Sequence, residues 1–484
     1  LYVSDSYLPS GLIQSMLEEA GFPVDPEALY VSGEVGLMKY TGDLFEHVLQ
    51  REGLEAGDLH HVGDHPRRDL RIPTRMGIRA ETISDAELTR HERASLRGRN
   101  GQLWVPAAIA GVSRAARLSV SGEHAEPDVG PLVTGVFGPL FVAYVAWVLN
   151  DATRRGLDTL YFVSREGQRF LEIVEALRPH LDFPIPECRY LYGSRRAWLF
   201  PAITEPEREQ LEWLVLATMS VAPTLEKLEL EPGEVEATLR EVGLWGRLDE
   251  ELEGADQERL WEFLASPEVW SRVGERAEEA RGLTLDYFEQ EGLLESDRWA
   301  MVDLGWSLNL QASLRKLLGL RGREESVRGY YLFVAGERRS NGEVGEYRSF
   351  LVSEEDPELM DLLWKRAAIF EDVFLMPDHG SVAGYRRKGN RIEPDFQHYE
   401  MDERRRNHLE RLRAGLTAYA TELGRSGLIP RHLESIRMIA LDGVRRFLAT
   451  PTQQEASSIA WIRCVQDATH ARDLSRPIAR PLRM

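Results

Sequence analysis

The chain has 484 residues and a formal net charge of −20, with 43% hydrophobic and 29% charged residues. This length exceeds the usual size of one hydrophobic core, so we expect two or three domains with the composition of an ordinary globular protein. The negative charge opposes binding to nucleic acid or anionic membranes, because long-range repulsion disfavours encounter with either.

The first eighty residues have the strand–helix alternation of a parallel α/β sheet. Strands are predicted at 1–3, 28–31 and 59–62, and helices at 11–20 and 42–51. The strand at 59–62 breaks at Gly63 and Asp64, and a second acid, Asp69, follows five residues later. Ligands of open α/β sheets bind at the carboxyl ends of strands. Because Mg²⁺ prefers carboxylate oxygens, this loop is a candidate magnesium site.

The motifs before this loop add a hydroxyl and a lysine. The first strand ends in Ser4 and an acid, and Lys39 precedes an amphipathic helix. Hydroxyl, lysine and paired acids, in this order and spacing, resemble motifs two to four of the haloacid-dehalogenase-like (HAD) hydrolase superfamily over residues 1 to about 80. The resemblance implies a partial Rossmannoid parallel sheet over 1–82. In it, Ser4 would hydrogen-bond phosphoryl oxygens, Lys39 would neutralise their charge, and Asp64 with Asp69 would hold Mg²⁺.

The first motif of that family has no counterpart in this sequence. HAD enzymes begin with a strand that carries an Asp nucleophile and a second Asp two residues later. Nucleophilic catalysis by a carboxylate requires that carboxylate. Two expectations follow: the chain is an N-terminally cut fragment, or this half is inactive. We favour the fragment, because a parallel sheet without its central strand would be a poor independent domain.

Residues 83–130 are predicted to be a helical linker, followed by an uncharged stretch of twenty residues from Pro131 to Asn150. Twenty apolar residues are near the length of a membrane-spanning helix. Prolines and glycines interrupt the first half, however, so the helix is expected to run from about Pro139 to Gly156. We therefore predict a buried core helix and no membrane span.

A second α/β domain is predicted over 131–355. Apolar strands are expected at 159–163, 188–192, 299–304 and 327–334, with a helical insertion at about 203–295. Residues 356–484 read as a mainly helical C-terminal region with a short hairpin at 381–393. The two cysteines, Cys188 and Cys464, lack metal-binding spacing and fit a reducing, cytoplasmic location.

Three strand ends of the second domain carry polar groups: Ser164, Arg165 and Glu166; Ser194 and Arg195; and Asp303, Trp306 and Ser307. Each end precedes a helix, and helix N-termini bind anions. The arginines could clamp a phosphate, and Asp303 could hold a metal or accept a proton from a substrate hydroxyl. The side chain of Trp306 could stack on a sugar or base ring. The alternative is that these groups are helix caps and ion pairs; convergence on one sheet edge would favour function.

Four sequence segments of the second domain carry a second resemblance. GPLFVAYVAWVL, YFVSREGQRF, YLYGSRRAWL and MVDLGWSLNLQASL look like the second domain of large bacterial proteins that begin with a HAD-like domain. The match extends to about residue 385 and includes Glu371, Gly380, Ser381, Gly384 and Tyr385. Many of those proteins are associated with surface-polysaccharide biosynthesis, which implies enzymes of that process as partners.

Three hypotheses follow. The first is a Mg²⁺-dependent phosphoryl hydrolase or transferase of HAD type that acts on a phosphorylated sugar or polysaccharide precursor. The second is a transferase centred on the second domain that binds a phosphorylated or nucleotide-linked substrate. The third is a non-catalytic scaffold of a polysaccharide-biosynthesis assembly. Convergence of the three strand ends on one pocket, away from Asp64, would favour the second.

Overall fold

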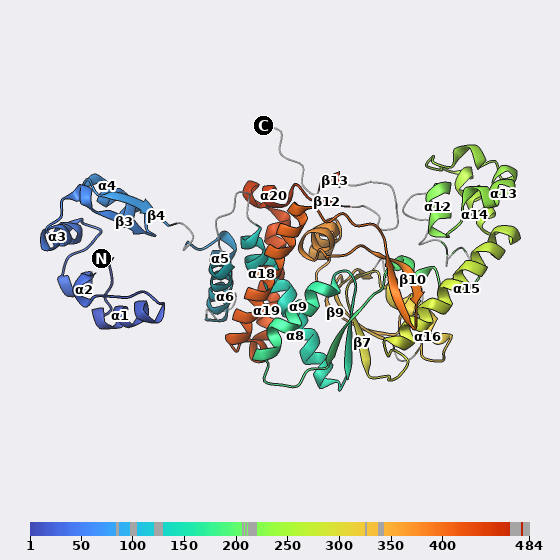
Figure 1. Ribbon diagram of the computed structural model, residues 1–484, viewed down its shortest axis with the longest axis horizontal. Helices are drawn as coiled ribbons and strands as arrows, with labels where there is room; N and C mark the ends of the chain where they lie inside the picture. The colour runs from blue at the N-terminus through green and yellow to red at the C-terminus, as the bar shows by residue number, and fades with distance from the viewer. Residues whose placement is uncertain are drawn as a thin grey trace. The chain divides into compact units, whose positions relative to one another are not determined.

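The computed structural model describes residues 1–83, 87–96, 104–120, 129–205, 208, 211, 220–324, 327–336, 343–464 and 476–477. The chain forms two compact units, Leu1–Leu88 and Thr89–Met484 (Figure 1). The second unit contains a five-stranded sheet, and a helical region follows that sheet in the chain. The predicted α/β fold is therefore confirmed.

The first unit alternates short strands and helices. Its elements are β1 (Tyr2–Ser4), α1 (Ser10–Glu19), β2 (Leu29–Val31), α2 (Ser32–Val35), α3 (Asp43–Glu52), β3 (His60–Gly63), the π-helical turn η3 (Pro66–Arg71), α4 (Ile72–Arg75) and β4 (Arg79–Thr82). β1 pairs with β2 and β3 pairs with β4, both in parallel, as two separate two-stranded sheets. The alternation was predicted correctly, but the strands do not join into one sheet.

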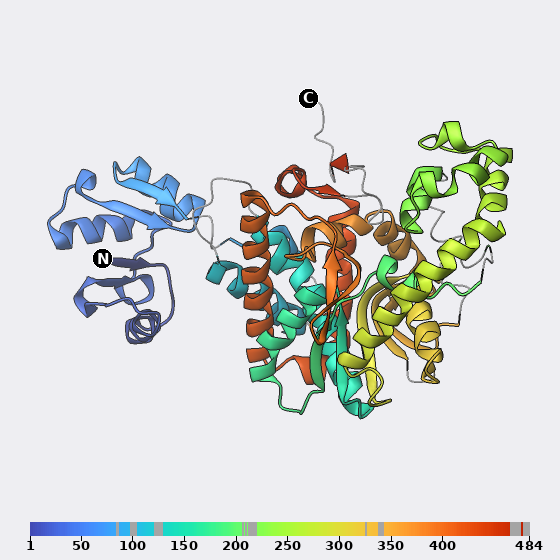
Figure 2. The same ribbon diagram turned by 45° about the vertical axis from the view of Figure 1, so that its right-hand side comes forward.

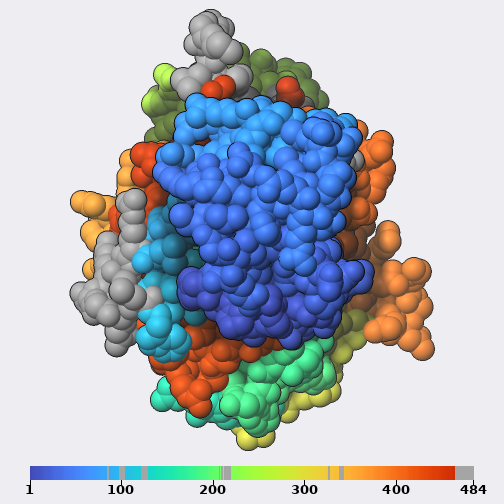
Figure 3. Space-filling model, turned by 90° about the vertical axis from the view of Figure 1, so that its left-hand side faces the viewer, coloured from blue at the N-terminus to red at the C-terminus, as the bar shows by residue number. Residues whose placement is uncertain are grey.

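The apolar core of this unit is small. Tyr30, Leu44 and Val48 form its buried cluster. The predicted helix 11–20 is present as α1, but it has no buried residue, and Leu12 and Met16 are 49% and 55% exposed. Figure 3 shows one face of this unit in blue.

The sheet of the second unit contains β5 (Thr159–Val163), β6 (Glu187–Leu191), β7 (Trp299–Trp306), β8 (Arg328–Val334) and β9 (Glu346–Val352). The strand order is β6-β5-β7-β8-β9, and all pairs are parallel. Numbered within this unit, the order is that of a doubly wound sheet, 2-1-3-4-5. The edge strand β9 was not predicted, because its first residues alternate between exposed and half-buried positions instead of forming an apolar run.

Helices cover both faces of this sheet (Figures 1 and 2). Leu160 and Phe162 face the core shared with α8 (Gly138–Arg154), α9 (Gly167–Leu177), α18 (Glu403–Arg425) and α19 (Ile429–Ala449). Tyr161 and Val163 face the opposite core, with α10 (Arg195–Leu199), α15 (Pro267–Gln290) and α16 (Asn309–Gly319). Because successive side chains of a strand point to opposite faces, strands covered on both sides must be apolar throughout.

The uncharged stretch predicted as a core helix is helical from residue 130. The short helix α7 (Gly130–Leu132) and the π-helical turn η4 (Val133–Phe137) run directly into α8. The predicted start near Pro139 was too late. The π-helical turn η4 lies before this proline and is continuous with α8, so the helix does not begin at Pro139. Of the described helices, this one alone is long and apolar enough to cross a membrane, and 94% of its apolar window is buried inside the protein. The prediction of a buried core helix is confirmed.

The helices predicted as a linker belong to the second unit. The apolar face of α6 (Trp104–Val120) contributes Val105, Ile109, Val112 and Ala116 to the same core as α8. The preceding helix α5 (Arg90–Ser95) is tied to α6 by an ion pair of 2.9 Å between Glu92 and Arg117. Residues 84–86, 97–103 and 121–128 of this stretch lie outside the described residues.

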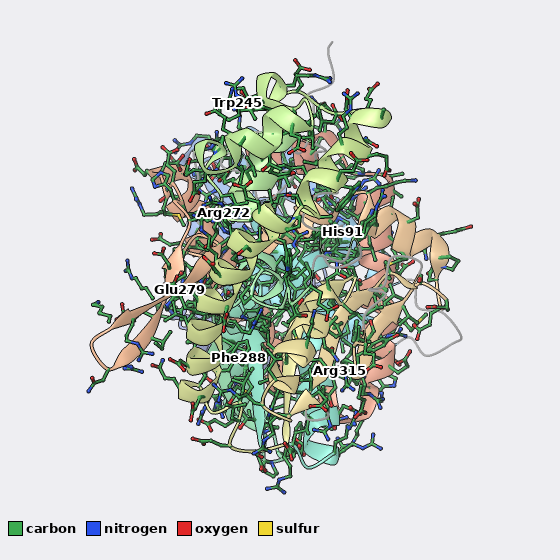
Figure 4. All side chains as sticks on the ribbon, turned by 90° about the vertical axis from the view of Figure 1, so that its right-hand side faces the viewer. His91, Trp245, Arg272, Glu279, Phe288 and Arg315 are labelled. Atoms are coloured by element: carbon green, nitrogen blue, oxygen red, sulfur yellow. The ribbon has the colours of Figure 1, made fainter. Side chains whose placement is uncertain are left out.

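The stretch predicted as a helical insertion contains α12 (Val221–Lys227), α13 (Glu236–Glu241) and α14 (Ala255–Leu264), and it has its own apolar core. The long helix α15 joins this core to the sheet, because Val269 and Val273 belong to the insertion core and Phe288 to a core of the sheet. Figure 4 labels Arg272, Glu279 and Phe288 along α15.

The C-terminal part contains α17 (Pro357–Trp364), the π-helical turn η10 (Ile369–Phe374), the hairpin β10–β11 (Val382–Lys388 and Arg391–Phe396), α18, α19, α20 (Gln453–Ile459) and the pair β12–β13 (Arg463–Cys464 and Arg476–Pro477). Its helices α18 and α19 share the core of α8, so they are part of the second unit and not a separate domain.

Candidate functional site

The three polar strand ends of the second unit lie around one cavity. Its volume is about 330 Å³, and all eight residues predicted for this domain line it: Ser164, Arg165, Glu166, Ser194, Arg195, Asp303, Trp306 and Ser307. They lie after β5 and β6 and in or directly after β7, and these three strands are neighbours in the sheet. β6 lies on one side of β5 and β7 on the other, so the direction in which the sheet grows reverses between β5 and β7. Ligands of doubly wound sheets bind at this point.

Ser164 joins the ends of β5 and β6. Its Oγ donates to the carbonyl of Gly193 at 2.7 Å and accepts from the Gly193 N–H at 3.0 Å. A Cβ at position 193 would lie 2.3 Å from the ring of Trp198, so glycine is required there. The Ser164 hydroxyl thus holds the two strand ends together.

Arg165 pairs with carboxylates. Its Nη2 lies 3.7 Å from both Glu166 Oε1 and Asp372 Oδ1. Burial alone would lower the pKa of Arg165, but the charges of Glu166 and Asp372 outweigh it and raise the pKa. Burial also raises the pKa of Glu166. The charge of this arginine is therefore already balanced, which disfavours its predicted role as a phosphate clamp.

The end of β6 offers two arginines. Ser194 caps α10, because its Oγ accepts from the Ala197 N–H at 3.0 Å and donates to the Val382 carbonyl at 2.6 Å. Arg195 is exposed and has no side-chain partner in the described part of the chain. The next residue, Arg196, also lines the cavity; it contacts Glu229 at 3.8 Å, and its buried Nε has no hydrogen-bond partner among the described residues. These two guanidinium groups can bind an anion.

A left-handed turn follows Asp303. Gly305 has a φ of +112°, and a Cβ there would lie 2.1 Å from the Phe333 carbonyl oxygen, so the position requires glycine. Trp306 and Leu308 also have positive φ, 77° and 62°, a conformation that costs free energy for residues with a side chain. This turn brings Ser307 and the first residue of α16, Asn309, to the cavity. Leu308 gives α16 no side-chain cap, so N–H groups of its first turn stay available.

The Trp306 side chain is fixed. Its Nε1 donates to Glu371 Oε1 at 2.8 Å, and its ring packs against Phe333 and Trp364, with centroids 5.3 and 5.6 Å away. Only 8% of the residue is exposed. The predicted stacking on a sugar or base ring therefore has little open ring surface available.

Asp303 is the most perturbed carboxyl of the cavity. It is 9% exposed, and burial, with the negative charges of Glu166 and Glu371, raises its pKa to about 8. The pKa of Asp372 is raised to about 7, mainly by burial. Glu166, Glu371 and Asp372 thus lie near Arg165, and Asp303 lies near Glu166 and Glu371, so the four carboxyl groups cannot all ionise at low cost.

Two of these acids come from a segment that was not predicted to form part of the site. Glu371 and Asp372 lie in the π-helical turn η10, and Glu371 lines the cavity together with Ser381 and Gln397. Glu371 and Ser381 stood in the motifs of the second resemblance, whereas Asp372 had no signal beyond following Glu371. Their arrival at the cavity depends on the tertiary fold.

Two of the predicted residues of the first unit, Lys39 and Asp69, are in contact. Lys39 Nζ lies 2.6 Å from Asp69 Oδ1, and His61 Nε2 lies 2.9 Å from the same oxygen. The His65 N–H donates to Asp69 Oδ2 at 3.0 Å. Burial alone would raise the pKa of Asp69, but hydrogen bonds from His61 and Lys39 outweigh it and hold the pKa well below its usual range. The Lys39 N–H donates to Asp5 Oδ1 at 2.7 Å, which links the ends of β1 and β3.

The metal-binding prediction for this loop stays open. Both oxygens of Asp69 are engaged, whereas Asp64 is exposed with no partner among the described residues. Ser4 is half-buried at the end of β1. Within the described ranges, no group of three or more His, Cys, Asp or Glu side chains could hold a metal ion. These residues alone do not complete a Mg²⁺ site, so the magnesium prediction rests on Asp64.

Sequence comparisons add no family. No protein-family model matches this chain, and no curated protein matches it significantly. The functional assignment therefore depends on the geometry of the two sites.

Proposed function

We propose that the protein is a transferase centred on its second unit, which moves a group from a phosphorylated or nucleotide-linked donor to an acceptor hydroxyl. One observation carries this proposal: the ends of β5, β6 and β7 converge on one cavity at the point where the strand order reverses. A cavity of about 330 Å³ is large enough for a small ligand.

The donor phosphate binds at the cationic side of the cavity. Arg195 and Arg196 supply guanidinium donors that the described part of the chain leaves largely unused. Arginine binds phosphate through two parallel hydrogen bonds, and the free N–H groups at the start of α16 add further donors. Arg165 has a different role, because it neutralises Glu166 and Asp372.

Asp303 is the general base. In the transfer step, the acceptor oxygen forms a bond to the transferred group, and the bond from that group to the donor phosphate oxygen breaks. The phosphate leaves with the electron pair, and the hydroxyl proton moves to Asp303. A carboxylate with a pKa of about 8 accepts a proton more readily than an ordinary one. Glu371 positions the neighbouring Trp306 through its indole N–H.

The test separates binding from turnover. Calorimetry with pyrophosphate, a nucleoside diphosphate and sugar phosphates measures affinity for the full chain, for Arg195→Ala and for Arg154→Ala. Arg154 is also an exposed arginine, at the end of α8, with no partner among the described residues, so its variant is the matched control.

We expect Arg195→Ala to weaken binding about tenfold or more, because a charge-assisted bidentate contact contributes ~1.5–3 kcal/mol. Arg154→Ala should bind as the unaltered chain does. Asp303→Asn should retain binding and lose turnover. Absence of binding by every anion, or equal affinity of the two arginine variants, would refute the proposal.

The first unit supports a second candidate, a HAD-like phosphoryl hydrolase that acts on a phosphorylated sugar. The supporting observation is that Lys39 links the ends of β1 and β3 through Asp5 and Asp69. Bound Mg²⁺ would supply charge stabilisation at the phosphoryl group. The test is phosphatase activity with Mg²⁺ on a panel of sugar phosphates. Activity lost in Asp64→Ala and kept in Asp303→Asn assigns it to the first unit; the reverse pattern assigns it to the second.

We further propose a cytoplasmic location, small phosphorylated substrates and enzymes of polysaccharide biosynthesis as partners. The buried position of the long apolar helix supports a chain that does not cross the membrane through it. The net charge of −20 supports the absence of nucleic-acid partners.

A further inference from the structure

The stretch 66–79 of the first unit differs in charge from the rest of the chain. It contains five arginines, Arg67, Arg68, Arg71, Arg75 and Arg79, in a protein whose net charge is −20. The one acid in the stretch, Asp69, is 1% exposed and pairs with Lys39. The arginines are therefore not neutralised from within their own segment.

Three of these arginines form an exposed row. Arg67, Arg71 and Arg75 are four residues apart along η3 and α4, and all three are exposed. Asp69 and Pro73, on the other side of the same helical stretch, are buried. Residues about one turn apart are neighbours on one side of a helix, so the three side chains form a row although η3 is the wider, π-helical turn.

None of the five arginines has a carboxylate partner within the described ranges. Arginines of the second unit commonly do, such as Arg117 with Glu92 and Arg413 with Glu172. Five arginines without carboxylate partners among the described residues, in one short stretch, leave a local excess of positive charge.

An aromatic side chain holds the row at one end. The Arg67 guanidinium lies 4.1 Å from the centroid of the Tyr40 ring, and Tyr40 is 45% exposed. A cation over a ring is attracted to it, which limits the motion of the arginine and lowers the entropy lost when it binds. We call Tyr40, Arg67, Arg71 and Arg75 the arginine face.

We propose that the arginine face binds an acidic helix of a partner protein. Exposed tyrosine and arginine together are typical of the centres of protein interfaces. A row of cations about one helical turn apart matches carboxylates one turn apart on a partner helix. A long polyanion would extend beyond the row onto an acidic protein, where it is repelled. Neither proposed reaction uses these arginines, although Tyr40 and Arg67 are sequence neighbours of Lys39, Asp64 and Asp69.

The experiment measures binding of a labelled helical peptide with Glu at every fourth position to the full chain, by fluorescence anisotropy. The same peptide with Gln in those positions, a single-stranded DNA and anionic vesicles are the competing probes. The test variant is Arg67→Glu/Arg71→Glu/Arg75→Glu. The control, Arg321→Glu/Arg391→Glu/Arg431→Glu, changes the net charge equally at exposed arginines of the second unit without partners among the described residues.

We expect the Glu peptide to bind, and to bind more weakly at higher salt concentration. The test variant alone should lose about tenfold or more in affinity, because three surface ion pairs at ~0.5 kcal/mol each give that factor. Arg67→Gln/Arg71→Gln/Arg75→Gln gives the same loss if the reversed variant does not fold. Equal loss in the control, equal binding of the Gln peptide, or tighter binding of DNA or vesicles would overturn the proposal.

Discussion

The ionisation of Asp303 links activity to stability in a way that can be measured. The residue is 9% exposed within the central strand β7, and its pKa is raised to about 8 in the folded protein. Its value in an unfolded chain is about 4. As the pH rises from about 4 to about 8, the unfolded state loses this proton first, so the free energy of unfolding falls through that window.

The magnitude follows from proton linkage. A group protonated in the folded state and ionised in the unfolded state changes the free energy of unfolding by about 1.4 kcal/mol for each pH unit. The substitution Asp303→Asn removes the ionisation and keeps the shape. Between about pH 5 and pH 7, the variant should therefore gain about 3 kcal/mol of stability relative to the unaltered chain.

Urea unfolding followed by tryptophan fluorescence tests this difference. All eleven tryptophans lie at or after Trp104, so the signal reports the second unit. The exposed Asp182, changed to Asn, is the control for loss of a solvated carboxylate. If Asp303→Asn and Asp182→Asn follow the same pH dependence, the raised pKa and the general-base role derived from it are both wrong. Transferase activity should rise through about pH 8 while stability falls.

Three further predictions concern single contacts. Lys39→Met should destabilise the first unit by about 3 kcal/mol or more, because the buried carboxylate of Asp69 loses the lysine that pairs with it. Hydrogen exchange of residues 1–83 measures this loss of stability. The lowered pKa of Asp69 contributes stability above its unfolded pKa of about 4, so that unit should lose protection below this pH, and Lys39→Met/Asp69→Asn should lose less. Gly305→Ala should destabilise the second unit by about 3 kcal/mol or more, because the new Cβ would lie 2.1 Å from the Phe333 carbonyl at a φ of +112°. Gly233 has open space around it, so Gly233→Ala should change the midpoint of urea unfolding little.

Local sequence patterns predicted the elements of the second sheet well where the pattern was unambiguous. β5 was predicted at its observed bounds, because a fully apolar run of five residues between polar turns fits a strand buried on both faces. The edge strand β9 was missed because its exposed positions carry polar residues. The helix start at Gly130 was missed because a π-helical turn is set by packing around it and not by proline alone.

The sequence also predicted which polar residues lie at the strand ends, but it did not predict their roles. The sequence indicated Ser164 and Ser194 as polar groups near a sheet edge, and both hydroxyls turned out to hold backbone groups of other segments. Arg165 was predicted as a phosphate clamp, yet its charge is balanced by Glu166 and Asp372. A side chain's role depends on which neighbours share its space, and those neighbours are distant in the chain.

The sequence by itself determined the α/β class, the helical insertion and the polar strand ends, because these depend on short-range patterns of apolar and turn-forming residues. Only the tertiary structure decided the strand order, which puts β7 beside β5 although more than a hundred residues separate them in the chain. The order follows from burying both faces of the sheet at once, a condition set by the whole chain. The same packing carries Glu371 to Trp306 and surrounds Asp303 with low-dielectric protein, which gives this carboxyl its raised pKa.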